Sequence, residues 1–368
     1  MRSFTSIYVS SAAIFCIHII CCAASLAIKP WLQSRTIPEG PDNSNKLRYW
    51  QFVKSSVNFS APSTELERMR LQKFAGSLWD FDEALHGLTY DLGSELAQKD
   101  YWSADEDIFC PPRETEVDLQ LAPGQQCDIP YPGLSPAKPF HDPRGFPWWQ
   151  SFTEQTHVIV EEFDLFLKGR GEEQAKAATS SILIWDKSKT ELCNNTEGFS
   201  KLTLLNEKGD ATLTGRRHFP ETIALLQKVL LQGNYLAPRP VNINCQLPNT
   251  GLAPHSDNMN FLFTCHLGLM IPEKGKCIFR MASGETLGGG DYSKEEAPTR
   301  PCEVQWRRGQ MVVADTSFVH STKNESPAES RYVLSFSIWH PMLGEFERGG
   351  IVQLHDALQE AHRKTRHS

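Results

Sequence analysis

The feature that most constrains the fold is a series of short apolar segments between residues 181 and 339, interrupted by one helical pattern at 220–231. Each segment is bounded by Gly, Pro, Asn or Ser, as is typical of β-strands. Short strands with few helical crossovers predict antiparallel sheets packed on each other, rather than a doubly wound parallel sheet. We therefore expect a mainly β domain, a cupin-like jelly roll (double-stranded β-helix) with flanking helices, whose strands are Ser181–Trp185, Leu202–Leu205, Val241–Leu247, Phe261–Ile271, Cys277–Met281, Gln310–Asp315 and Tyr332–Trp339.

Side-chain alternation shows that two of these strands each have one polar face. Asn242, Asn244 and Gln246 alternate with apolar residues, and Arg331 begins a strand whose Ser335 and Ser337 share its face. Successive side chains of a strand point to opposite faces. The polar faces either line a polar barrel interior or meet solvent, and the sequence leaves both alternatives open.

Beyond residue 27, the sequence predicts three further regions outside this domain. Residues 28–109 form a mainly helical N-terminal region of unknown role, in which Thr64 and Glu67 make a capping box. Nine prolines in 110–149 predict a linker or an extended arm. The jelly roll then occupies 150–345, with a helix over 151–167 and a long loop over 283–301, and 346–368 is a C-terminal tail.

The N-terminus resembles a secretory signal, because Phe4 to Ala27 contains no charged residue and ends in small residues. We expect residues 1–27 to be a cleaved signal peptide, with a retained single-pass signal anchor as the alternative. Either case predicts the lumen of the secretory pathway (endoplasmic reticulum or Golgi) or secretion, and glycosylation at Asn58 and Asn194.

Charge and cysteine content narrow the class of protein further. The net charge of −7, from 44 acidic and 37 basic residues, argues against nucleic acid as a partner. Seven cysteines follow the signal segment, and none belongs to a CxxC pair, so a structural zinc site is not expected. Cys110 with Cys127 and Cys277 with Cys302 are plausible disulfides.

The chemistry-bearing residues are His255, Asp257, His320 and Arg331. Two imidazoles and one carboxylate form the facial triad that binds iron(II) in non-haem oxygenases and leaves coordination positions open. In an extended segment, residues two apart point the same way, which suits His255 and Asp257. Arg331, a short hairpin beyond His320, supplies a planar guanidinium suited to the distal carboxylate of 2-oxoglutarate.

These residues stand within a longer pattern that resembles the aspartyl/asparaginyl beta-hydroxylase family of iron(II)- and 2-oxoglutarate-dependent oxygenases. The similarity covers roughly residues 130–345. The matching positions are Tyr131–Leu134, Phe219–Thr222, Pro254-His255, His266–Leu269, Ile271-Pro272, Trp306 with Gly309, Asp315, Ser317-Phe318, His320, Arg331 and Trp339–Pro341.

The resemblance implies roles for further residues. It makes His255 and His320 iron ligands, Arg331 the anchor of 2-oxoglutarate, and His266 a neighbour of the cosubstrate's other end. Asn244 falls where the family often has a serine that assists the distal carboxylate. Two departures stand out: Thr264 replaces an arginine of the family's protein hydroxylases, and Asp257 supplies a carboxylate where the animal enzymes have glycine.

We therefore expect a dioxygenase that uses Fe(2+), 2-oxoglutarate and O2, with ascorbate as a possible reductant, to hydroxylate an unactivated C–H bond. By resemblance the substrate is an Asp or Asn side chain of a secreted protein or peptide. The acyl chain of a lipid is the alternative substrate. A non-catalytic jelly-roll binding protein is the alternative class, and a membrane is a partner only if the signal is retained as an anchor.

Overall fold

The computed structural model describes residues 53, 55–59, 61–81, 121–135, 137–176, 186–187, 198–282 and 302–365. These residues belong to two compact units, one built from 118–127 and 133–348 and the other from 1–117, 128–132 and 349–368. The predicted signal segment, the strand at 181–185, the loop at 283–301, Cys110 and Asn194 lie outside the described residues.

The larger unit contains two antiparallel sheets, which confirms the predicted two-sheet jelly roll. The larger sheet has the strand order β1-β9-β6-β11-β4-β3-β2, and the smaller has the order β5-β10-β7-β8. The strands of the larger sheet are β1 (Phe140–His141), β2 (Asp186–Lys187), β3 (Phe199–Leu205), β4 (Val241–Gln246), β6 (Leu262–Met270), β9 (Met311–Ala314) and β11 (Arg331–Trp339). Those of the smaller sheet are β5 (Thr250–His255), β7 (Cys277–Met281), β8 (Cys302–Gln305) and β10 (His320–Asn324).

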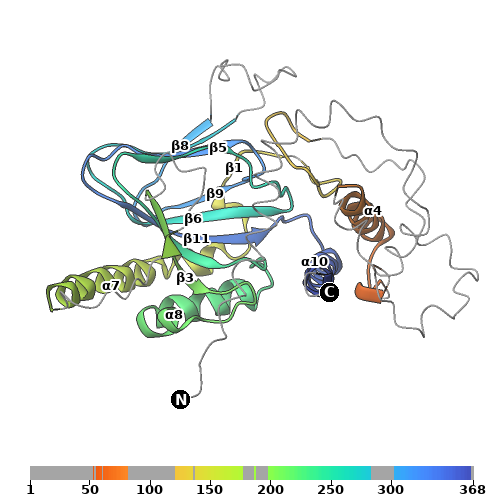
Figure 1. Cartoon of the computed structure of the whole chain (residues 1–368), viewed down its shortest axis with the longest axis horizontal. Coiled ribbons are helices and arrows are strands. Elements are labelled where there is room, and N and C mark those ends of the chain that lie inside the picture. The colour runs from red at the N-terminus through yellow and green to blue at the C-terminus, as the bar shows by residue number, and fades with distance from the viewer. Residues whose placement is uncertain are drawn as a thin grey trace, which may run out of the picture. The chain divides into compact units, whose positions relative to one another are not determined.

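Helices cover the outer face of the larger sheet, on the side away from β5 and β8 (Figure 1). They are α6 (Trp149–Thr153), α7 (Thr156–Lys176), α8 (Leu213–His218) and α9 (Pro220–Leu225), which continues as η3 (Leu226–Leu231). Both predicted helical segments of this unit are confirmed, although the first is broken at 154–155. Glu162 of α7 accepts hydrogen bonds from the backbone N–H groups of Glu221 and Thr222, and so caps α9.

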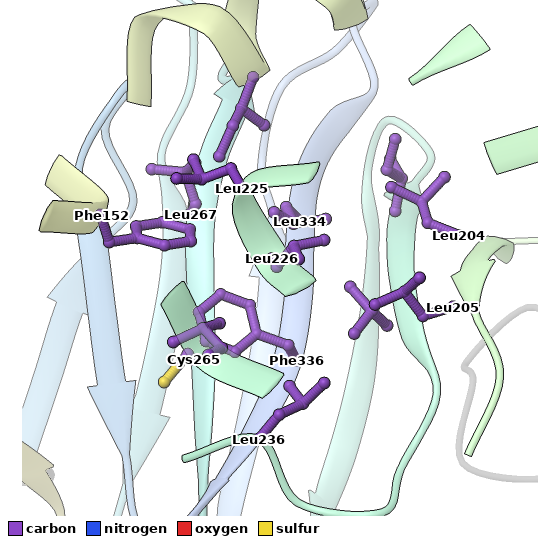
Figure 2. Close-up of a cluster of buried hydrophobic side chains, with 14 of the residues drawn as sticks. Phe152, Leu204, Leu205, Leu225, Leu226, Leu236, Cys265, Leu267, Leu334 and Phe336 are labelled. Atoms are coloured by element: carbon purple, nitrogen blue, oxygen red, sulfur yellow. The ribbon is translucent and has the colours of Figure 1, made fainter. Parts of the chain in front are cut away.

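The main core lies between these helices and the sheet. Leu225 and Leu226 pack over the apolar faces of β6 and β11, which carry Leu267 and Phe336 (Figure 2). The remaining labelled members of this cluster are Phe152, Leu204, Leu205, Leu236, Cys265 and Leu334. Because the apolar residues of β4 and β11 are used on this side, their polar faces turn toward the smaller sheet.

A second cluster marks the interior between the two sheets. Val333 of β11 packs there with Phe279 and Met281 of β7. Val333 lies on the same face of β11 as Arg331 and Ser335. The polar faces of β4 and β11 therefore line the barrel interior, which decides between the two alternatives left by the sequence.

Five strands were not predicted from the sequence: β1, β2, β5, β8 and β10. β1 and β2 have two residues each and β8 (CEVQ) has four, whereas TGLAPH of β5 and HSTKN of β10 lack the apolar alternation on which the prediction depended. The predicted Cys277–Cys302 disulfide is wrong. Cys302 pairs with Met281 at one end of the β7–β8 ladder, whereas Cys277 is buried at the other end, and neither forms a disulfide.

The smaller unit contains α4 (Glu65–Phe81) and the greater part of α10 (Glu345–Thr365). The predicted capping box is confirmed, since the Thr64 N–H donates to Glu67 and the Glu67 N–H donates to the Thr64 hydroxyl. A Cβ on Gly350 of α10 would lie 2.2 Å from a methyl group of Leu71 in α4, so a larger residue would require the Leu71 side chain to move. None of the described helices has an apolar stretch long enough to cross a membrane.

Candidate metal centre

The three predicted metal ligands lie together at one end of the smaller sheet. His255 ends β5 and His320 begins β10, and the two occupy directly paired positions of the antiparallel ladder. Their ring centroids are 4.3 Å apart. One ligand atom from each of His255, Asp257 and His320 lies within 4.8 Å of the others. A β-bulge between His320 and Thr322 interrupts the ladder next to this group.

Backbone carbonyls fix the orientation of both imidazoles. The Nδ1 atoms of His255 and His320 lie 2.7 Å and 2.9 Å from the carbonyl oxygens of Ala253 and Phe318. A carbonyl oxygen only accepts, so each Nδ1 carries a proton, and in the neutral imidazole Nε2 is then the nitrogen available to a metal. Burial, with the nearby His255, also lowers the pKa of His320 to about 4, so its imidazole is neutral at pH 7. Two imidazoles that present Nε2, together with a carboxylate, are a donor set that fits a divalent transition metal.

A chain of rings connects this group to Arg331. The ring of Phe279 lies 5.6 Å from His320 on one side, and 5.6 Å from His266 and 5.2 Å from Trp306 on the other. The guanidinium carbon of Arg331 then lies 4.0 Å from the centre of the Trp306 indole ring. The predicted cosubstrate residues, His266 and Arg331, therefore share the barrel interior with the predicted metal ligands.

Several buried polar atoms of this interior have no hydrogen-bond partner among the described residues. They are Nε and one terminal nitrogen (Nη1) of Arg331, Nδ1 of His266 and Nε1 of Trp306. Unpaired buried donors cost about 1–3 kcal/mol each, which is a reason to expect a ligand that satisfies them. Burial lowers the pKa of Arg331 only to about 10, so the guanidinium stays cationic at pH 7. These donors fit an anion with carboxylate oxygens, as 2-oxoglutarate has.

Asn244 lies on the inner face of β4, but its register partner on β11 is Val333. The residue directly paired with Arg331 is Gln246, whose side chain is already committed: Nε2 donates to the Thr250 carbonyl, and Oε1 accepts from Thr322. Asn244 therefore lies on the strand next to Arg331 and on the interior face of the sheet, without a described contact to Arg331. The sequence analysis assigned no role to Trp306 or Gln246, although strand alternation had already placed Gln246 on the polar face.

Thr264, at the position where the family's protein hydroxylases carry arginine, contacts a second threonine. The Thr264 hydroxyl lies 3.0 Å from the hydroxyl of Thr316. The carbonyl of Thr316 in turn accepts a hydrogen bond of 2.8 Å from the backbone N–H of Asp257. Two hydroxyl groups therefore stand beside the Asp257 segment at this point.

Comparison with known proteins agrees with the resemblance seen in the sequence. A profile of the aspartyl/asparaginyl beta-hydroxylase family matches residues 154–288 and 296–341, about half of the chain. A Xenopus tropicalis protein, aspartate beta-hydroxylase domain-containing protein 2, is 31% identical over 108 residues, which are 29% of this chain and 24% of that protein. Mouse aspartyl/asparaginyl beta-hydroxylase is 25% identical over 217 residues, 55% of this chain and 24% of that enzyme. The chain thus spans about a quarter of the length of these relatives.

Solved structures give weaker overlaps. AviO1 from Streptomyces viridochromogenes has a TM-score of 0.31 and 14% identity, over 50% of this chain and 86% of that one. A Pseudomonas putida prolyl-4-hydroxylase has a TM-score of 0.27 and 13% identity, over 49% and 86%. The jelly-roll assignment rests on the strand order and register of the two sheets, and not on these overlaps. All the residues of the candidate site lie within the matched region, and through residues 154–341 the chain belongs to the aspartyl/asparaginyl beta-hydroxylase family.

Proposed function

We propose that the protein is an iron(II)- and 2-oxoglutarate-dependent dioxygenase that hydroxylates an unactivated C–H bond. One observation carries the proposal: the group His255, Asp257 and His320 shares a buried interior with the unpaired donors of Arg331 and His266. A metal site alone, or a cationic pocket alone, would not distinguish this chemistry. Their combination supports a metal-bound cosubstrate whose far carboxylate needs a cation.

Each residue has a role that its position supports. His255, Asp257 and His320 would hold the metal, and the two carbonyl hydrogen bonds keep both Nε2 atoms directed for ligation. Arg331 receives the distal carboxylate, and its stacking on Trp306 holds the guanidinium plane in place.

His266 and Asn244 would complete the cosubstrate pocket. His266 stays neutral, since burial lowers its pKa to about 3, and offers Nδ1 toward the ligand's other end. Asn244, on the inner face of β4, would assist the distal carboxylate with its amide N–H. When bound, iron(II) and 2-oxoglutarate supply the oxidising chemistry, consuming O2 and yielding succinate and carbon dioxide, with ascorbate as reductant.

We propose an Asp or Asn side chain of a secreted protein or peptide as the substrate. The family assignment and the name of the mouse relative, aspartyl/asparaginyl beta-hydroxylase, support this class. The charge-free segment from Phe4 to Ala27 supports a site of action in the secretory pathway.

The test uses the full chain purified after expression in a secretory host. Incubation with iron(II), ascorbate and 2-oxoglutarate should yield succinate, and Asp- or Asn-containing peptides should gain 16 Da in mass spectrometry. His320→Ala is the matched inactive control. Succinate without peptide oxidation would keep the chemistry and refute the substrate class, and a gain of 16 Da on lipids would assign it to acyl chains. A lack of succinate from metal-loaded wild-type protein would refute the enzymatic proposal.

A further inference from the structure

A segment N-terminal to the family match runs beside the metal centre. Residues 122–126, named the strap, belong to the same compact unit as the two sheets. The backbone of the strap pairs with the loop that leads to His320: the Val319 N–H donates to the Gly124 carbonyl at 2.9 Å, and the Gln126 N–H donates to the Ser317 carbonyl at 2.7 Å. The strap therefore holds the loop before the third metal ligand.

The strap also holds the segment between the first two ligands. Ser256 lies between His255 and Asp257, and its hydroxyl is 2.5 Å from the Gln126 carbonyl and 2.9 Å from the Ser317 carbonyl. This hydroxyl is buried, so its proton is shared by two carbonyls that belong to the strap and to the third ligand's loop. All three ligand segments thus meet at one cluster of hydrogen bonds.

The Gln125 side chain is the polar centre of this cluster. Its Nε2 donates both protons, one to Asp315 at 3.0 Å and one to the Ser317 hydroxyl at 2.9 Å, while its Oε1 accepts from the Ala122 N–H at 2.8 Å. The other Asp315 oxygen accepts from the Ser317 N–H and hydroxyl. Asp315 and Ser317 are both almost completely buried, and burial raises the pKa of Asp315 to about 7. A buried carboxyl oxygen that loses its donor is left unsatisfied, so the loop would rearrange without Gln125.

We propose that Gln125 is a positioning residue, which sets the arrangement of His255, Asp257 and His320 by fixing the strap to the Asp315–Ser317 loop. The inference rests on the proposed function, because it assumes that these three residues bind the metal. It assigns a part of the metal centre to a segment outside the region that the family profile matches. Gln125 is not itself one of the three proposed metal ligands, and its side chain bonds to Ala122, Asp315 and Ser317.

The test compares Gln125→Ala with Gln126→Ala in the full chain. Gln126 takes part in the cluster only through its backbone N–H and carbonyl, so its truncation is a matched control. Cobalt(II) is the probe, read by titration and by its visible spectrum without turnover, and thermal unfolding of the metal-free proteins is measured in parallel. We expect Gln125→Ala to weaken cobalt binding by about tenfold or more and to change the spectrum, because partners of metal ligands typically contribute 10–100-fold. Gln126→Ala should keep both.

A charge exchange separates positioning from simple folding. Q125E places a second carboxylate against Asp315 and should bind cobalt more weakly than Gln125→Ala. Q125E/D315N restores one amide and one carboxylate with their places exchanged, and should recover most of the affinity and the wild-type spectrum. If Gln125→Ala does not fold, the comparison of Q125E/D315N with Q125E replaces it. Recovery of cobalt affinity in the double variant then supports the positioning role.

Wild-type affinity and spectrum in Gln125→Ala, or no recovery in Q125E/D315N, would overturn the inference while the proposed function stands. Failure of the wild-type protein to bind cobalt would overturn both.

Discussion

The guanidinium carbon of Arg331 lies 4.0 Å from the centre of the Trp306 indole ring, and two of the three Arg331 nitrogens have no hydrogen-bond partner among the described residues. The stacking orients the guanidinium plane while leaving its donors available. A planar fork held in this way can receive a carboxylate through two parallel hydrogen bonds.

Arg331→Lys is expected to weaken 2-oxoglutarate binding by at least about tenfold, because an ammonium group replaces the bidentate fork at unchanged charge. Metal affinity should change little, since Arg331 is separated from the triad by Phe279 and His266. Calorimetry with manganese in place of iron measures both affinities. Arg280→Lys, in a half-exposed ion pair with Glu303, is the control. Unchanged cosubstrate affinity in Arg331→Lys would remove the anchor role.

Asp257→Ala is expected to lower metal affinity and turnover by at least about tenfold, because the carboxylate offsets part of the metal's double positive charge. Asp257→Glu, one methylene longer, should keep partial metal binding with a misplaced ligand. Metal titration followed by succinate formation at limiting iron measures both effects, with the exposed Asp356→Ala as control. Full activity of Asp257→Ala at limiting iron would reduce the site to its two histidines.

Peptides that differ only in one residue, Asn or Asp, should be hydroxylated to different extents, with Asn preferred. The Thr264 and Thr316 hydroxyls beside the Asp257 segment can hydrogen-bond a neutral amide, whereas the Asp257 carboxylate would repel an ionised carboxylate placed near it. Competition between the two peptides, read by mass spectrometry, measures the ratio. A preference for the Asp peptide would show that another cation receives the side chain.

His141 is expected to make the fold sensitive to acid. It stacks on Phe263 with ring centroids 4.1 Å apart, and burial lowers its pKa from 6.5 to about 4. Between these pH values the unfolded chain binds a proton that the folded chain does not, so the free energy of unfolding falls as the pH drops from about 6.5 to 4. His141→Phe keeps an aromatic ring against Phe263 and removes the imidazole that binds this proton.

Urea unfolding at pH 7.5 and pH 5 tests this expectation. His141→Phe should lose less stability between the two pH values than the wild type, by on the order of 1 kcal/mol. His157→Phe, at an exposed position of α7, is the control and should follow the wild type. Equal losses in His141→Phe and wild type would assign the acid sensitivity to other groups.

The proposed passage through the secretory pathway predicts glycosylation of Asn58, which is exposed in the described structure. When the chain is expressed in animal cells, glycosidase treatment should increase the gel mobility of the wild type, and this increase should be smaller for Asn58→Gln. Asn324 should not be modified, because it is fully buried and its amide donates to the carbonyls of Gln246, Leu247 and Glu329. An unglycosylated, full-length protein in the cytosol would contradict this placement.

Sequence reasoning identified those parts of the fold whose patterns are strong. The alternation in β4 and β11, the apolar run of β6 and the capping box at Thr64 are local signals, and the structure has these elements where they were expected. The strands that carry His255 and His320 were not predicted, because β10 is polar on both faces and β5 has no regular apolar alternation, and because they pair only with each other and with β7. Their structure depends on partners far apart in the chain, which a local pattern does not contain.

The same distinction applies to the site. The ligand triplet and Arg331 were recognised by residue type and order, whereas the stacking of Arg331 on Trp306 and the Gln125 cluster required the three-dimensional arrangement. Gln125 lies 190 residues before Asp315, and no spacing rule connects them. The direction in which the polar faces turn followed only from the helices that cover the opposite side.

The paired positions of His255 and His320 limit how this chain can change in length. A deletion of one residue within β5 or β10 would turn one imidazole to the opposite side of the sheet, because strand side chains alternate with a period of two. Length changes in the connection between β7 and β8, which leaves the β5–β10 pairing untouched, carry no such penalty. Relatives that keep the reaction should therefore vary in length in that connection and preserve residue counts within these two strands.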